Sequence, residues 1–223
     1  MKLTINIPET LNEVTLKQYQ KWLKIADGKE LDSFLQQKMV EIFCNIPLKQ
    51  VLQIKATDIN NICEELSKLF NNEPKFIDRF TLNDKEFGFI PKLDDISFGE
   101  YVDLDTYLAD WELMNKAIGV LYRPITYKKK QQYLIEEYES AEKYDMTETT
   151  LDVVFGAIVF FYSLKNELQK TILNYLATQK EIELPQHLRD SLQNGAGINL
   201  STDLLMETFS NTIKLPNQNY TPV

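Results

Sequence analysis

The side chains with the greatest potential for chemistry are five aspartates in the middle of the chain. They are Asp94, Asp95, Asp103, Asp105 and Asp110. Paired carboxylates serve glycosidases as acid and base, and clustered carboxylates bind divalent metals. The spacing does not match an EF-hand loop, because no alternating run of oxygen ligands ends in a bidentate Glu. An enzyme built here would bring Asp94, Asp95 and Asp103 into one cleft and raise their pKa values.

The same aspartates have a simpler interpretation, which we favour. Asp94 and Asp95 precede a predicted helix start, where carboxylates interact favourably with the helix dipole. Asp103 and Asp110 are seven residues apart and fall on one predicted solvent face. Glutamates at positions 136–142 continue the acidity. This pattern predicts a charged surface that suits a basic partner.

Other catalytic residue types are sparse. His187 is the one histidine, and the cysteines are Cys44 and Cys63. Triads, Cys–His pairs and histidine metal sites all need a histidine with partners, and His187 is expected on an exposed helical turn. The chain has no P-loop, dinucleotide-binding or G-x-S-x-G motif. We therefore expect no catalytic residues, no cofactor and no metal site. The cysteines lie among apolar residues and are expected to be buried, reduced thiols.

Net charge argues against a nucleic-acid backbone as partner. The chain has 223 residues, a net charge of −9 and a pI near 4.8. Binding phosphates needs clustered basic residues, and the one tight cluster, Lys128–Lys130, is expected to be a solvated turn. The most apolar run, 153–162, is about half as long as a membrane span requires. No signal peptide is expected at Met1, so synthesis and assembly are expected in the cytoplasm.

The periodicity predicts an α+β fold that is mainly helical. Alternation predicts a strand over Lys2–Ile7, which Pro8 ends. The segments RFTL and EFGFI flank the turn-prone pair Asn83–Asp84, which predicts a β-hairpin over about 78–90. The strand and the hairpin are expected to form a small antiparallel β element, because three strands are more stable than a lone hairpin.

Helical spacing accounts for most of the remaining chain. Thr15 with Gln18, and Ser97 with Glu100, are expected capping boxes at two helix starts. A helix from about Leu151 to Thr178 is expected to cross the core with its apolar first half. The other predicted helices cover about 16–27, 30–45, 47–54, 57–70 (capped by Thr57), 98–108, 112–122 and 128–139, a short one from Pro185, and 201–213.

We expect three regions along the chain. Residues 1–150 form a helical domain with the N-terminal strand and the hairpin. Residues 151–213 supply the long core helix and the C-terminal helices. Residues 214–223, with the sequence KLPNQNYTPV, form an extended tail.

A set of motifs gives the chain a family resemblance. The motifs are LTINIPETLNEVTLKQYQKWLKI, FGFIPKLDDISFGEYVDLDTYL, and KAIGVLYRPIT with YLIEEY just after. Together they resemble proteins from the structural modules of tailed bacteriophages, especially the crAss-like phages of gut Bacteroidales. The resemblance covers roughly the first two-thirds of the chain. It implies a non-enzymatic virion protein in the portal and tail region, acting as a ring or adaptor protein or as internal cargo, with other virion proteins as partners. It also implies no catalytic residues.

Four residues are candidate interface residues in such an assembly. Arg123 ends a predicted helix before Pro124, and its planar guanidinium suits a carboxylate on a neighbouring subunit or within the chain. Tyr101 and Tyr107 lie near polar helix faces, and tyrosine is enriched in interface anchors, although both could pack in the core. Tyr220 lies in the tail. A ring of identical subunits would use two different surfaces of each subunit.

Two other functions stay open at this point. A tail assembly chaperone would bind another phage protein transiently and be absent from the finished particle. An enzyme would use the aspartates described above.

Overall fold

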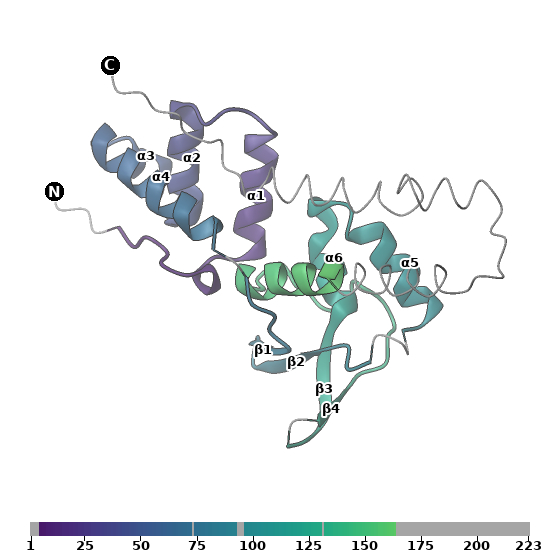
Figure 1. Ribbon diagram of the computed structural model, residues 1–223. Helices are drawn as coiled ribbons and strands as arrows, with labels where there is room; N and C mark the ends of the chain where they lie inside the picture. Colours follow the sequence, from purple (N-terminus) through teal and green to yellow (C-terminus); the bar gives the residue numbers. More distant parts are fainter. Residues whose placement is uncertain (1–4, 73, 93–95, 131, 164–223) are drawn as a thin grey trace, which may run out of the picture.

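The computed structural model describes residues 5–72, 74–92, 96–130 and 132–163. In Figure 1 the first helices gather on one side of a small sheet, and the helix over 151–163, drawn in green, lies between them and the sheet. The helices are α1 (Leu16–Ala26), α2 (Ser33–Phe43), α3 (Leu48–Val51), α4 (Ala56–Phe70), α5 (Phe98–Tyr107) and α6 (Met114–Leu121), with 3-10 turns η1 (Leu11–Glu13) and η3 (Trp111–Leu113). The described part of the chain is thus mainly helical, which confirms the predicted class.

The capping box at the start of α1 is formed as predicted. The backbone N–H of Thr15 donates to Oε1 of Gln18 at 2.9 Å, and the N–H of Gln18 donates to the Thr15 hydroxyl at 3.3 Å. Thr57, however, does not cap α4. The carbonyl of Lys55 accepts from the N–H groups of both Asp58 and Ile59 at 3.0 Å, so α4 begins at Ala56 and Thr57 lies inside its first turn.

Four strands form an antiparallel sheet in the order β1-β2-β3-β4. They are β1 (Arg79–Leu82), β2 (Lys85–Phe89), β3 (Tyr122–Lys129) and β4 (Gln132–Ile135). Asn83 and Asp84 join β1 to β2 with φ of 48° and 61°, the left-handed pair that a type I′ hairpin turn needs. The predicted β-hairpin is therefore confirmed.

The predicted helix over 128–139 is wrong, because this segment contains the end of β3 and all of β4, and residues 136–139 are in neither helix nor strand. Tyr127 pairs with Leu134 and Lys129 with Gln132 across the hairpin. Lysine, glutamine and glutamate are good helix formers, but helix propensity contributes little free energy per residue, and pairing of β3 with β2 overrides it. Pro124 also lies within β3, opposite Phe87, and not in a loop after a helix.

The predicted N-terminal strand is not present in the residues described there. Residues 5–7 belong to no strand, and residues 1–4 lie outside the described part of the chain. Ile5 and Ile7 are half-buried and pack against the core. The third and fourth strands of the sheet come instead from β3 and β4.

The helix over 151–163 is the centre of the core, as its apolar sequence predicts. Leu151, Val154 and Ala157 are fully buried, and the ring of Phe155 lies 5.3 Å from that of Tyr19 on α1. These residues share one core with the chain before position 151. The predicted continuation of this helix to 178, the helices from Pro185 and at 201–213, and the tail over 214–223 lie outside the described residues.

Candidate interaction surfaces

Helix α5 begins with the second predicted capping box. The Ser97 N–H donates to Oε2 of Glu100 at 2.7 Å, and the Glu100 N–H donates to the Ser97 hydroxyl at 3.3 Å. Both contacts satisfy N–H groups that the first turn of a helix leaves unpaired.

The other oxygen of Glu100 binds Arg123 at the start of β3. Oε1 of Glu100 lies 2.7 Å from Nη2 of Arg123, and the two side chains are only 7% and 11% exposed. The Tyr138 ring lies 5.7 Å from the guanidinium and adds a cation–π contact. Arg123 Nε is buried without a hydrogen-bond partner. This ion pair fastens α5 to the sheet, so the observed contact of Arg123 is within the chain.

The aspartates that suggested chemistry have structural contacts where they are described. Asp103 accepts a hydrogen bond from the Tyr138 hydroxyl, and burial together with this contact raises the pKa of Tyr138. Asp110 accepts from the Glu112 N–H at 2.8 Å and caps η3. Asp105 is exposed, and positions 94 and 95 lie outside the described residues. In the described ranges, no three His, Cys, Asp or Glu side chains cluster closely enough to hold a metal ion.

One face of α5 exposes apolar side chains. Phe98 is 81% exposed, Tyr101 57% and Val102 42%, and their spacing of three and four residues puts them on one side of the helix. Glu100 and Leu104 occupy the buried side. Tyr107 is half-buried, with the Lys116 ammonium 5.4 Å from its ring. Of the predicted interface tyrosines, Tyr101 is therefore at the surface and Tyr107 packs on the core.

A second apolar surface lies on the hairpin of β3 and β4. Tyr127 and Leu134 are direct cross-strand partners, and they are 56% and 61% exposed. Lys129 and Lys130 are exposed near them. Sequence reasoning missed Leu134 because it placed this residue in a helix over 128–139, and it did not single out Tyr127, which directly precedes that range.

Phe98 and Val102 were also missed, although the sequence carries a signal for them. Phe98 lies three residues from Tyr101 and four from Val102, so the three side chains share one side of a helix. Leu104 and Leu108 are the apolar residues that attach this segment to the core. Apolar residues left over from a buried stripe indicate a second contact surface. Tyr220, the fourth interface candidate, lies outside the described residues.

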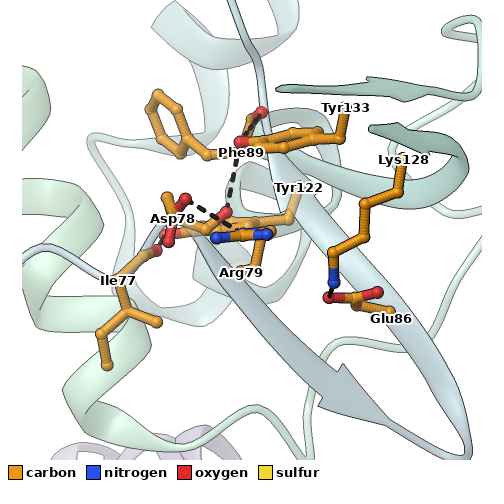
Figure 2. A network of polar contacts seen from close by, with 8 residues as sticks. All are labelled: Ile77, Asp78, Arg79, Glu86, Phe89, Tyr122, Lys128 and Tyr133. Atoms are coloured by element: carbon orange, nitrogen blue, oxygen red, sulfur yellow. Dashed lines mark hydrogen bonds and ion pairs between the residues drawn. The ribbon is translucent and has the colours of Figure 1, made fainter. Parts of the chain in front are cut away.

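A polar network holds the base of the hairpin in place (Figure 2). The Tyr122 hydroxyl donates to the Ile77 carbonyl at 2.6 Å, and the Tyr133 hydroxyl donates to the Phe89 carbonyl at 2.8 Å. Lys128 pairs with Glu86 of β2 at 2.6 Å. Because these contacts join β3 and β4 to the chain around β1 and β2, they orient the hairpin and its exposed side chains.

Both cysteines are buried and free, as predicted. Burial raises the pKa of Cys44 to about 11 and that of Cys63 to about 12. Thiols with such pKa values stay protonated at neutral pH and are poor nucleophiles. Cys44 borders a surface hollow of about 470 Å³ whose lining includes Lys17 and Glu148, an exposed ion pair at 3.0 Å.

Comparison with known protein families, with curated proteins and with solved structures finds no match to this chain. None of the helices in the described ranges is long and apolar enough to cross a membrane.

Proposed function

We propose that this protein is a non-enzymatic structural component of a tailed-phage virion. It acts in the portal and tail assembly as a ring or adaptor protein, or as internal cargo. The observation that supports this best is the presence of two exposed apolar surfaces, on α5 and on the β3–β4 hairpin. The phage context rests on the sequence motifs in the first two-thirds of the chain.

Exposed apolar side chains gathered on one element are a common mark of protein–protein contact. Both surfaces are fixed to the core, α5 through the Glu100–Arg123 pair and the hairpin through Tyr122 and Tyr133. A rigid surface loses little conformational entropy on binding, which favours a permanent part of an assembly.

The carboxylates also favour a structural role over a catalytic one. Asp103 binds the Tyr138 hydroxyl, Asp110 caps a helical turn, and Glu100 pairs with Arg123. Each of these contacts stabilises the fold around α5. A tail assembly chaperone remains the second candidate function, because the exposed apolar face of α5 would serve transient binding equally well.

Quantitative mass spectrometry of purified particles, set against lysate of infected cells, tests this proposal. The control proteins are the major capsid protein and a non-structural protein of the same phage. We expect the chain in particles at a fixed ratio, about a dozen copies for a ring with closed cyclic symmetry at the portal. Abundance in lysate with absence from particles would contradict the proposal and identify a chaperone.

A further inference from the structure

We propose that α5 of one copy docks on the β3–β4 hairpin of a second copy of this chain. The α5 face consists of Phe98, Tyr101, Val102 and Asp105. The hairpin face consists of Tyr127, Lys129, Lys130 and Leu134. This inference deepens the proposed function, because it names the two surfaces through which copies would assemble, and it rests on that function only for its biological setting.

The α5 face is apolar with an acidic margin. Helix α5 carries Glu100, Asp103 and Asp105 and no basic residue. Arg123 neutralises Glu100. Asp103 is held by the Tyr138 hydroxyl on another side of the helix. Asp105 is exposed, lies one turn from Tyr101 and Val102, and has no cationic partner among the described residues, so its carboxylate remains uncompensated on this face.

The hairpin face is apolar with a basic margin. Tyr127 and Leu134 lie opposite each other, and Lys129 follows Tyr127 by two residues, which puts it on the same side of the strand. Lys128 points to the other side and is paired with Glu86. Lys129 and Lys130 form no ion pair with the described part of the chain, so two ammonium groups remain uncompensated there.

The α5 face and the hairpin face complement each other in apolar side chains and in charge. Apolar side chains at the centre would exclude water, and opposite charges at the margin would set the orientation of the two copies. Contact between two α5 faces would instead bring carboxylates together, and contact between two hairpin faces would bring lysines together. The charges therefore select the contact between unlike faces.

Such a contact leaves one copy with an unused hairpin face and the other copy with an unused α5 face. In Figure 1 the hairpin of β3 and β4 reaches away from α5. The apolar side chains of both faces are exposed in the same copy. Contacts between unlike surfaces propagate, and they form a ring if the rotation closes and a filament if it does not.

Sedimentation velocity of the full chain over a range of concentrations tests this inference. The contact is small, so association is followed up to about 100 μM protein. One variant, Tyr101→Gln with Val102→Gln, removes the apolar centre of the α5 face. The other, Tyr127→Thr with Leu134→Thr, removes that of the hairpin face. Leu52→Gln is the matched control, since Leu52 is 63% exposed and lies outside both faces.

We expect the unmodified chain and the Leu52→Gln control to associate, and added salt to weaken association by screening the charged margins. Each double variant should raise the dissociation constant by at least about 10-fold. A mixture of the two double variants should form a 1:1 heterodimer and nothing larger, because only one intact α5 face and one intact hairpin face can meet. Circular dichroism of each variant establishes that it is folded.

Two results would overturn the inference. One is that the unmodified chain sediments as a monomer at all protein concentrations up to about 100 μM. The other is association that only one of the two double variants weakens, since that indicates contact between like faces or a different surface. These results leave the proposed function standing if the chain is found in particles at a fixed ratio. Conversely, absence from particles contradicts the proposed function while head-to-tail association in solution persists.

Discussion

Glu100 and Arg123 meet 2.7 Å apart beneath α5, and almost no solvent reaches either side chain. The Glu100 carboxylate performs two tasks, since one oxygen closes the capping box with Ser97 and the other binds the guanidinium. The start of a helix and the start of a strand are thus joined through one side chain. The exposed α5 face depends on this junction for its position.

Breaking this ion pair should destabilise the protein strongly. Arg123→Met leaves the Glu100 carboxylate buried without its partner, which should lower the free energy of unfolding by about 3–5 kcal/mol in urea denaturation. Adding Glu100→Gln to Arg123→Met should recover part of the loss, because glutamine removes the charge and still serves a capping box.

Lys17→Met is the control for this prediction, because it breaks the exposed pair with Glu148, whose side chains are 68% and 47% exposed. We expect Lys17→Met to leave the free energy of unfolding without a measurable change. An Arg123→Met variant as stable as Lys17→Met would show that the buried pair contributes little.

Two helical glycines should respond oppositely to alanine. A Cβ on Gly119 of α6 would lie 2.6 Å from the carbonyl oxygen of Ala141, which is backbone and cannot easily move. Gly119→Ala should therefore lower the free energy of unfolding by about 1–3 kcal/mol. Gly99 of α5 has open space around it, so Gly99→Ala should raise stability by about 0.5–1 kcal/mol through helix propensity. Thermal unfolding of the two variants measures both effects, and equal melting temperatures would contradict the packing at Gly119.

The two cysteines should be unreactive in the folded protein. Burial raises the pKa values of Cys44 and Cys63 to about 11 and about 12 from an ordinary 9.0. Because the thiolate is the reactive form, a thiol reagent at about pH 8 should modify neither residue until guanidinium unfolds the chain. Cys44→Ala should then leave one reactive thiol. Rapid reaction of the native protein would contradict the burial of these side chains.

The same thiols should make stability fall at high pH. Their raised pKa values in the folded state mean that this contribution to stability is complete below pH 9.0 and is lost as pH rises toward 11 and 12. Urea denaturation of the unmodified chain and of Cys63→Ala at several pH values should show a shallower decline for the variant. Parallel curves would mean that Cys63 ionises equally in both states.

Glu136 should contribute stability that acid removes. The Tyr144 hydroxyl donates to it at 2.7 Å, and Lys143 lies 3.1 Å away, so the pKa of Glu136 falls below its ordinary 4.5. This stabilisation is present above pH 4.5 and is lost as pH falls through the lowered pKa. Tyr144→Phe removes the hydroxyl and keeps the ring against Phe87.

The difference in unfolding free energy between the unmodified chain and Tyr144→Phe should therefore be larger at about pH 7 than at about pH 3. Tyr101→Phe is the matched control, since this tyrosine is exposed and its hydroxyl has no hydrogen bond in the described part of the chain. A pH-independent difference for Tyr144→Phe would show that its hydroxyl does not act through Glu136.

Features that depend on neighbours in sequence were predictable. The boxes at Thr15 and Ser97 each join residues three apart, and the Asn83–Asp84 turn joins two adjacent strands. The apolar run after Leu151 could only be buried, because exposing it to water would cost too much free energy. The capping boxes and the turn depend on contacts between residues close together in the chain, and the burial of the apolar run follows from its composition.

The errors fall where distant contacts compete with local preference. The segment after Lys128 is rich in helix-forming residues, yet it became β4 because β3 pairs with β2, some forty residues earlier in the chain. Residues 5–7 alternate as a strand does, but they pack on the core without joining the sheet.

Local hydrogen bonds and apolar periodicity specify the mainly helical α+β class, the capping boxes at Thr15 and Ser97, the β1–β2 hairpin and the buried cysteines, so these features could be predicted from sequence. Three features follow from the packing of distant elements: Arg123 pairs with Glu100, Tyr101 faces outward while Tyr107 packs inward, and Tyr127 pairs with Leu134 on an exposed surface. These outcomes depend on which elements approach each other in space. Side-chain type and spacing cannot specify that approach, because the same residues satisfy their hydrogen bonds in more than one pairing.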